Sequence, residues 1–251
     1  KPLTVKTPAG LAAAPSATAA AALQNGEVDW WERPHPDLQP LLARARDVRR
    51  EVSDIGGRLA VLCMNCLHPP FDDVRVRRAV RLSVLQDDYM RASRGDDRTD
   101  WDICRSLWPR HTPYYEDLGE AVMPGDLDRA RAALREAGYA NQRVVVINPT
   151  DFPDIGPLGQ VTADRLKRIG MNIDLAESDW GTVVQRRSNR ETVDRGGWSI
   201  LHTTGGATAW ARPTPPRPSA TSTTSARNST APWNPTPPPS NSSRKAATTT
   251  S

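Results

Sequence analysis

The apolar residues of this chain follow two periodicities that alternate along the sequence. The clearest helical stripe consists of five apolar residues at three-to-four spacing, Leu127, Ala130, Ala133, Leu134 and Ala137. Asp126 is placed to cap this helix and Gly138 to end it. The run Arg143 to Ile147, with Asn148-Pro149 as a turn, follows as a short apolar strand.

The same patterns predict the rest of the chain. Helices are expected at 16–24, 37–45, 155–169 and 180–188, and from Asp72 onward. Strands are expected at 27–30, 58–64, 172–175 and 198–202, and the 58–64 run is apolar enough to be buried on both faces. Helices and strands in regular alternation predict an α/β domain with its ligand crevice at the strand ends.

Composition divides the chain into a globular body and a tail. Residues 211–251 are dominated by Pro, Ser and Thr, and no Asp or Glu follows Asp194. The net charge of +4 therefore comes from the tail, which argues against a nucleic-acid partner for the body. No stretch approaches the roughly twenty apolar residues of a membrane span.

The titratable residues favour no enzyme. Cys63 and Cys66 form C-x-x-C with His68 nearby, but the motif ends a strand, whereas a redox thiolate needs a helix N-terminus. Cys104 and His111 follow no zinc spacing, so buried structural cysteine is the better interpretation. Nucleophile-elbow, phosphate-loop and metal-binding His motifs are missing from the sequence, and we expect no cofactor and no metal.

Tryptophan is unusually frequent, with eight against two phenylalanines. Four of them lie at predicted element ends, where ligand-facing residues tend to sit: Trp30, Trp31, Trp180 and Trp198. Core or rim packing is the alternative for each. Four arginines between 75 and 81 fall on the polar side of the helix that starts near Asp72, and a solvated face is favoured over an anion site.

Several segments, taken in order, resemble family 5 extracytoplasmic solute-binding proteins of ABC transporters, the peptide- and nickel-binding type. The most specific is Pro-Pro-Phe-Asp-Asp-Val-Arg-Val-Arg, which begins at Pro69. The resemblance runs from about Ala13 to Thr204 and also includes 21–29, 126–139, 166–174 and 178–180.

The resemblance implies a partial type II periplasmic-binding-protein fold. It implies a remnant of the first lobe at 1–62, a second α/β lobe at 63–210 and a disordered tail at 211–251. The family's members lie outside the cytoplasmic membrane, close around a small solute and present it to membrane permease subunits. We therefore expect capture of a peptide-like, opine-like or metal-chelate solute, without catalysis.

Trp180, Trp198 and His202 are the expected pocket residues. The resemblance also implies that peptide-binding members carry an aspartate three residues after the tryptophan, where this chain has Leu201. A free peptide amino group would lose a charge-assisted hydrogen bond there, which argues against ordinary peptides as the ligand.

The chain is expected to be truncated at both ends. The acid-free tail is typical of a GC-rich gene read in a shifted frame, so a frameshift near 205–210 is one hypothesis and a mucin-like stalk is the other. A non-transporting interaction protein, or an inert remnant of such a gene, is the alternative function.

Overall fold

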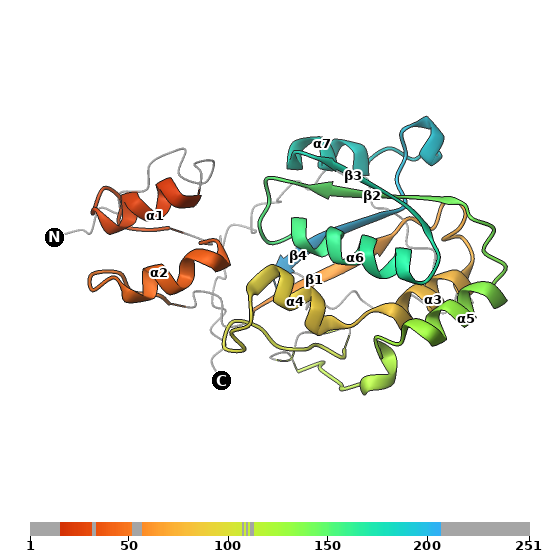
Figure 1. The fold of residues 1–251 in the computed structure, drawn as a ribbon, viewed down its shortest axis with the longest axis horizontal. Helices are drawn as coiled ribbons and strands as arrows, with labels where there is room; N and C mark the ends of the chain where they lie inside the picture. The colour runs from red at the N-terminus through yellow and green to blue at the C-terminus, as the bar shows by residue number, and fades with distance from the viewer. Residues whose placement is uncertain are drawn as a thin grey trace, which may run out of the picture.

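A four-stranded mixed sheet forms the centre of the computed structural model, which describes residues 16–31, 34–51, 57–106, 108, 110 and 113–206. Its strands lie in the order β1-β4-β2-β3 (Figure 1). β2 is parallel to β3 and β4, whereas β1 is antiparallel to β4. The strands are β1 (Arg58–Met64), β2 (Arg143–Pro149), β3 (Asn172–Ser178) and β4 (Ile200–Gly206).

The β1/β4 pair continues beyond its neighbour as a two-stranded ribbon. β4 pairs with β2 only at Ile200 and Leu201. It pairs with β1 along its whole length, with Met64 opposite Ile200 and Arg58 opposite Gly206. The paired strands β1 and β4 therefore extend past the edge of β2 as a two-stranded ribbon.

Helices cover both faces of the sheet, and each face has its own core. One face carries α3 (Val74–Ser83), α4 (Gln86–Arg94), α5 (Leu127–Glu136) and α6 (Gly156–Arg168), and the other carries α7 (Trp180–Arg187) and the short η4 (Val193–Arg195) (Figure 1). Side chains of β2 alternate between the two cores, because Val144 and Val146 face the first while Val145 and Ile147 face the second. The sheet is thus the middle layer of a three-layer α/β body.

Aspartate caps begin three of the helices. Asp73, Asp126 and Asp179 have extended backbones, and their carboxylates accept hydrogen bonds from the first-turn N–H groups of α3, α5 and α7. At the other end of α5, Gly138 has a φ of +77°, a left-handed conformation that a side chain would strain. The cap and stop predicted for this helix are confirmed.

A buried arginine holds four segments of the helical layer together. Arg165 of α6 donates from Nε to the carbonyl of Ser83, 2.5 Å away, and from Nη2 to the carbonyl of Gly125, 3.0 Å away. Its Nη1 pairs with the Asp88 carboxylate of α4. The Arg165 side chain is 5 % exposed, so this cation is compensated by groups from three other segments.

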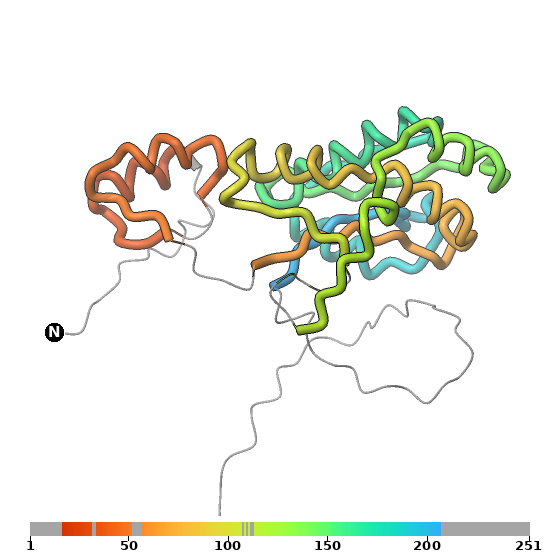
Figure 2. Tube along the Cα trace, turned by 90° about the horizontal axis from the view of Figure 1, so that it is seen from below, coloured from red at the N-terminus to blue at the C-terminus, as the bar shows by residue number. Residues whose placement is uncertain are grey.

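The first described residues form a small helical unit beside α4 (Figures 1 and 2). It contains α1 (Ser16–Gln24), η2 (Pro36–Leu38) and α2 (Gln39–Arg44), and its residues Ala19, Val28 and Leu42 are buried. Arg50 follows the unit and pairs with Asp100 of the body at 3.4 Å. The proposed boundary at residue 62 falls inside β1, and the division into lobes remains a prediction.

Several local predictions are wrong. Residues 27–30 are not a strand, and the predicted turn at 148–149 is the end of β2. β1 is only partly buried because it is the outermost strand of the sheet. α4 was not predicted, and β4 begins two residues later than expected and runs to Gly206. The tail and His111 lie outside the described residues.

Within the part of the chain that the structure describes, no helix has the length and apolar character needed to cross a membrane. η3 (Glu120–Val122) is a short helical turn between α4 and α5.

Candidate functional site at the carboxyl ends of the strands

The parallel strands β2 and β3 end side by side, and their carboxyl ends form the edge where a ligand site is expected. Thr150, just after β2, donates its backbone N–H to the Ser178 carbonyl at 2.9 Å. The loop to α6 and the start of α7 leave the sheet from these two ends. Loops at the carboxyl ends of parallel strands are where α/β sheets bind ligands.

Trp180 is held at this edge by the neighbouring loop. Its backbone N–H donates to Asp151 Oδ1 at 2.7 Å, and its ring lies 5.1 Å from the Phe152 ring at a tilt of 54°. The indole is half-buried, because it packs against the α7-side core and leaves part of its surface to solvent. This geometry presents a tilted aromatic pair to the edge.

Asp179 shapes the first turn of α7 beside the aromatic pair. Its Oδ1 accepts from the backbone N–H of Thr182 at 3.0 Å, and its Oδ2 accepts from the Thr182 hydroxyl at 2.5 Å. These bonds, first the hydroxyl and then the N–H, lower the pKa of the Asp179 carboxyl. The edge therefore keeps a negative charge across the neutral pH range.

Trp198 lies beneath α7. It is 5 % exposed, and its indole N–H donates to the carbonyl of Arg187 at the end of α7, 3.0 Å away. It belongs to the same core cluster that Trp180 packs against. The structure thus gathers the two predicted tryptophans on one face of the sheet, with Trp198 supporting α7 from below.

His202 faces the opposite side of the sheet. It is 4 % exposed, and its Nε2 lies 2.8 Å from the Thr162 hydroxyl of α6, which lies 2.9 Å from the Tyr89 hydroxyl of α4. Burial lowers the pKa of His202 to about 3, so the ring is neutral at physiological pH. The three predicted pocket residues are therefore not brought together.

Leu201 stands where the resemblance implies an aspartate in peptide-binding members. Its side chain is 2 % exposed and lies in the α7-side core with Val145 and Ile147. The argument against ordinary peptides as the ligand stays a prediction.

Sequence reasoning missed Asp151 and Phe152. The predicted turn at 148–149 ended β2 two residues early, so the residues after the strand were not considered as edge residues. Only their position in the sequence could have indicated them, because a polar and an aromatic residue follow directly after an apolar strand.

The cysteines show no arrangement for redox or metal chemistry. All three are free thiols, and Cys66 Sγ lies 3.4 Å from the carbonyl of Met64. Burial raises the pKa of the Cys63 thiol, which disfavours the reactive thiolate. Among the described residues, no three His, Cys, Asp or Glu side chains are grouped so that they could hold a metal ion.

Two surface clefts lie away from the strand edge. The larger, about 440 Å³, is beside the start of β2 and is lined by Pro69, Pro70, Asp72, Asp73, Val76, Ala137, Gly138, Tyr139 and Gln142. The smaller, about 210 Å³, lies between the start of α4 and the segment around Arg105 and Glu120.

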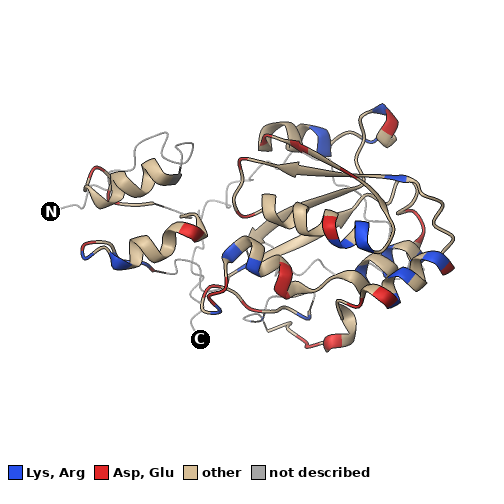
Figure 3. Cartoon of the chain, viewed as in Figure 1, with Lys and Arg blue, Asp and Glu red and all other residues tan. Residues whose placement is uncertain are grey.

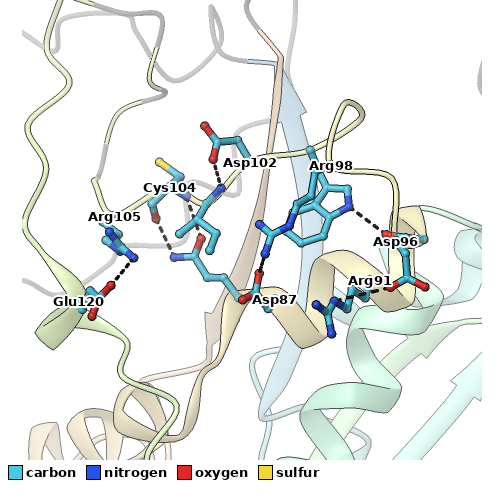
Figure 4. A network of polar contacts seen from close by, with 12 residues as sticks. Asp87, Arg91, Asp96, Arg98, Asp102, Cys104, Arg105 and Glu120 are labelled. Atoms are coloured by element: carbon cyan, nitrogen blue, oxygen red, sulfur yellow. Dashed lines mark hydrogen bonds and ion pairs between the residues drawn. The ribbon is translucent and has the colours of Figure 1, made fainter.

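A polar seam borders the smaller cleft and ties the segment after α4 back along that helix (Figure 4). The carboxamide of Gln86 donates to the Cys104 carbonyl at 2.7 Å and accepts from its N–H at 2.9 Å. Arg98 pairs with Asp87 at 2.6 Å and covers the Trp101 ring. Because these groups satisfy one another, the seam is structural.

Charged side chains on the outer helices are also paired locally. Figure 3 shows cationic and anionic residues interleaved on α5, whereas α3 carries arginines and no Asp or Glu of its own. Arg75 pairs with Asp73 at 2.7 Å, and Arg131 pairs with Asp128 at 2.6 Å. Interleaving of this kind is typical of a solvated helix face.

Comparison with known proteins decides the family. The model of bacterial extracellular solute-binding proteins, family 5, matches residues 12–228. The chain belongs to this family. The match continues past Thr204, where the resemblance seen in the sequence ended. The family consists of binding proteins rather than enzymes.

A curated relative from Sinorhizobium fredii, described as a probable peptide ABC transporter periplasmic-binding protein, is 38% identical over 188 residues. The match covers 74% of this chain and 35% of that protein, so the chain spans about a third of the relative's length.

Solved structures confirm the fold. The ABC transporter substrate-binding protein CtaP from Listeria monocytogenes matches with a TM-score of 0.63 and 20% identity, over 75% of this chain and 38% of that one. A dipeptide-binding protein from Pseudoalteromonas sp. SM9913, solved with Met-Leu, matches with a TM-score of 0.60 and 22% identity, over 75% and 36%. The predicted partial type II periplasmic-binding-protein fold is confirmed.

Proposed function

We propose that this chain supplies part of the substrate-binding component of an ABC importer, which captures a small solute outside the cytoplasmic membrane and delivers it to permease subunits. The family match over residues 12–228 carries the proposal. The solute is peptide-like, opine-like or a metal chelate. The relative from Sinorhizobium fredii, whose description names a peptide transporter, favours the first of these.

Within this function, Trp180 is the residue that contacts the solute. Its half-buried ring lies at the carboxyl ends of β2 and β3, beside Phe152 and next to the charged carboxylate of Asp179. An aromatic surface beside a fixed negative charge suits a solute with an apolar side chain and a cationic group.

Trp198 and His202 take indirect roles in the same site. Trp198 holds the last turn of α7 through the Arg187 carbonyl, and His202 ties β4 to α6 through Thr162. Both side chains are at least nine-tenths buried, so each supports the sheet from its own face rather than contacting the solute.

A ligand-induced thermal shift tests this function. The chain would be screened against dipeptides such as Met-Leu, opines, sugars and Fe(III)-EDTA, because a ligand that binds only the folded state raises the Tm. At 100 times its Kd a ligand contributes about 2.7 kcal/mol. Trp180→Ala should abolish the shift, whereas Trp30→Ala should keep it, because Trp30 is 48% exposed on the N-terminal helical unit.

The second candidate is a non-transporting interaction protein or an inert remnant of a receptor gene. It differs from the first candidate in predicting that no solute binds. If none of the four ligand classes raises the Tm of a chain that unfolds cooperatively, this second candidate replaces the first.

A further inference from the structure

A chain of buried polar groups reaches the sheet from the helical layer. It consists of Tyr89 on α4, Thr162 on α6 and His202 on β4, and all three residues are buried. The Tyr89 and Thr162 hydroxyls lie 2.9 Å apart, and Thr162 Oγ1 lies 2.8 Å from His202 Nε2. The Tyr89 and His202 rings lie beside each other, with their centroids 5.9 Å apart. Two helices and a strand are therefore joined by side chains in the interior.

One arrangement of protons satisfies every group in this chain. Burial lowers the pKa of His202, and a hydrogen bond to the backbone of Val61 opposes that shift, which is the effect of a ring N–H that donates. Because Nε2 faces Thr162, the donor is Nδ1, and Nε2 accepts from the Thr162 hydroxyl. The Thr162 oxygen then accepts from Tyr89. Burial raises the pKa of Tyr89, so the phenol keeps the proton that it donates.

His202 lies where the ribbon of β1 and β4 leaves the sheet. β4 pairs with β2 at Ile200 and Leu201, so His202 is the first residue of the part of β4 that pairs with β1 alone. Among the side-chain hydrogen bonds of the described residues, that of His202 is the one that joins this free part to the helices. The bond from Arg58 to Thr204, 3.0 Å long, stays within the ribbon.

We propose that Tyr89, Thr162 and His202 are positioning residues that fix the angle at which the ribbon leaves the sheet, through hydrogen bonds that run in one direction from Tyr89 to Val61. A buried hydroxyl or imidazole nitrogen is costly to leave without a partner, so any bend that separates His202 from Thr162 is resisted. This inference rests on the proposed function, in which structure attached through the ribbon closes over a solute at the strand edge. The three side chains act on that closure without contacting the solute.

Nitrogen NMR of the full chain tests the direction of the bonds. At neutral pH, long-range proton–nitrogen spectra should show His202 with its proton on Nδ1 and a bare Nε2. The signals are assigned by their absence from His202→Gln, because the chain has three other histidines. A proton on Nε2 would overturn the proposed direction, whether or not a solute is known.

Hydrogen exchange measures the effect on the ribbon. Thr162→Val keeps the size of the side chain but removes the middle hydroxyl, so the amides of 58–62 and 202–206 should exchange roughly tenfold faster, while those of β3 should not change. Thr162→Ser keeps the hydroxyl and should behave like the parent. If Thr162→Val does not fold, Tyr89→Phe takes its place, with an acceleration of about threefold because only the outer donor is lost.

Ser83→Ala is the matched control for these variants. It deletes another fully buried hydroxyl of the helical layer, but the bond of that hydroxyl, to the Val80 carbonyl at 2.7 Å, stays within α3. Equal acceleration of the ribbon amides in Ser83→Ala and Thr162→Val would indicate general loosening and would overturn the proposal.

Solute binding separates this inference from the proposed function. For Met-Leu, or whichever probe of the thermal screen raises the Tm, Thr162→Val should increase the Kd about threefold and Thr162→Ser should leave it unchanged. An unchanged Kd in Thr162→Val would contradict the positioning role. If no probe binds, the proposed function fails, while the His202 tautomer and the ribbon amides still decide whether the hydrogen-bond chain holds the ribbon.

Discussion

Replacing Arg165 tests whether the helical layer depends on its buried cation. Arg165→Met keeps most of the side-chain volume but removes the donors to the Ser83 and Gly125 carbonyls and the partner of Asp88. Ser83 is fully buried, so its carbonyl would be left unpaired at a cost of about 1–3 kcal/mol. Asp88 is 42% exposed, so water takes over much of its solvation and its contribution falls well below the 3–5 kcal/mol typical of a broken buried pair. We expect a total loss of about 3 kcal/mol.

Urea unfolding followed by circular dichroism measures this loss as a lower midpoint at unchanged m-value. Arg168→Met is the matched control, because Arg168 lies one turn away on α6, is 57% exposed and pairs with an exposed Asp164. It should cost less than about 0.5 kcal/mol. A loss for Arg165→Met no larger than that of the control would refute the assignment of Arg165 as the link between these helices.

Three further changes follow from the site and its supports. His202 has a pKa of about 3 in the folded state and 6.5 in the unfolded state, so on acidification the unfolded state binds the proton first. The free energy of unfolding should therefore fall by about 2 kcal/mol between pH 7 and pH 5. In a series of urea midpoints measured across this range, His202→Gln should remove most of the fall. Asp126→Ala removes the cap of α5 and should lower the free energy of unfolding in urea by about 1 kcal/mol. Asp128→Ala, in the same turn, should lower it little. Equal losses for the two variants would contradict the capping role. Gly159→Ala would place a Cβ 2.1 Å from Asn148 Oδ1 and should lower stability by about 1–3 kcal/mol; an unchanged Tm would show that this contact can relax freely.

Local sequence signals predicted the helices whose ends are marked by a capping residue and a glycine stop. The helix from Leu127 was predicted with its cap and stop, because Asp126 and Gly138 act through neighbouring backbone groups alone. α4 was missed because its polar residues face a seam formed by a distant segment, as when Gln86 binds the backbone of Cys104 eighteen residues away. Propensity cannot show a partner of that kind.

The candidate site was predicted less well, because side-chain direction depends on where a strand begins. Trp198 and His202 are four residues apart, a spacing that would put both side chains on one face of a continuous strand. β4 begins only at Ile200, however, and the two side chains lie on opposite sides of the sheet. Trp180 was predicted at the edge because it starts a helix directly after a strand. Phe152, which completes the aromatic pair, becomes visible only when β2 is known to continue through Pro149.

The ribbon formed by β1 and β4 constrains how any attached structure can move. Its strands are paired from Met64–Ile200 to Arg58–Gly206, beyond the last contact with β2. Neither strand can slide past the other without breaking that ladder, so bending or twisting must displace both together. Structure attached before Arg58 and after Gly206 would therefore rotate as one unit relative to the sheet. The stiffness that opposes this rotation comes from the two paired strands.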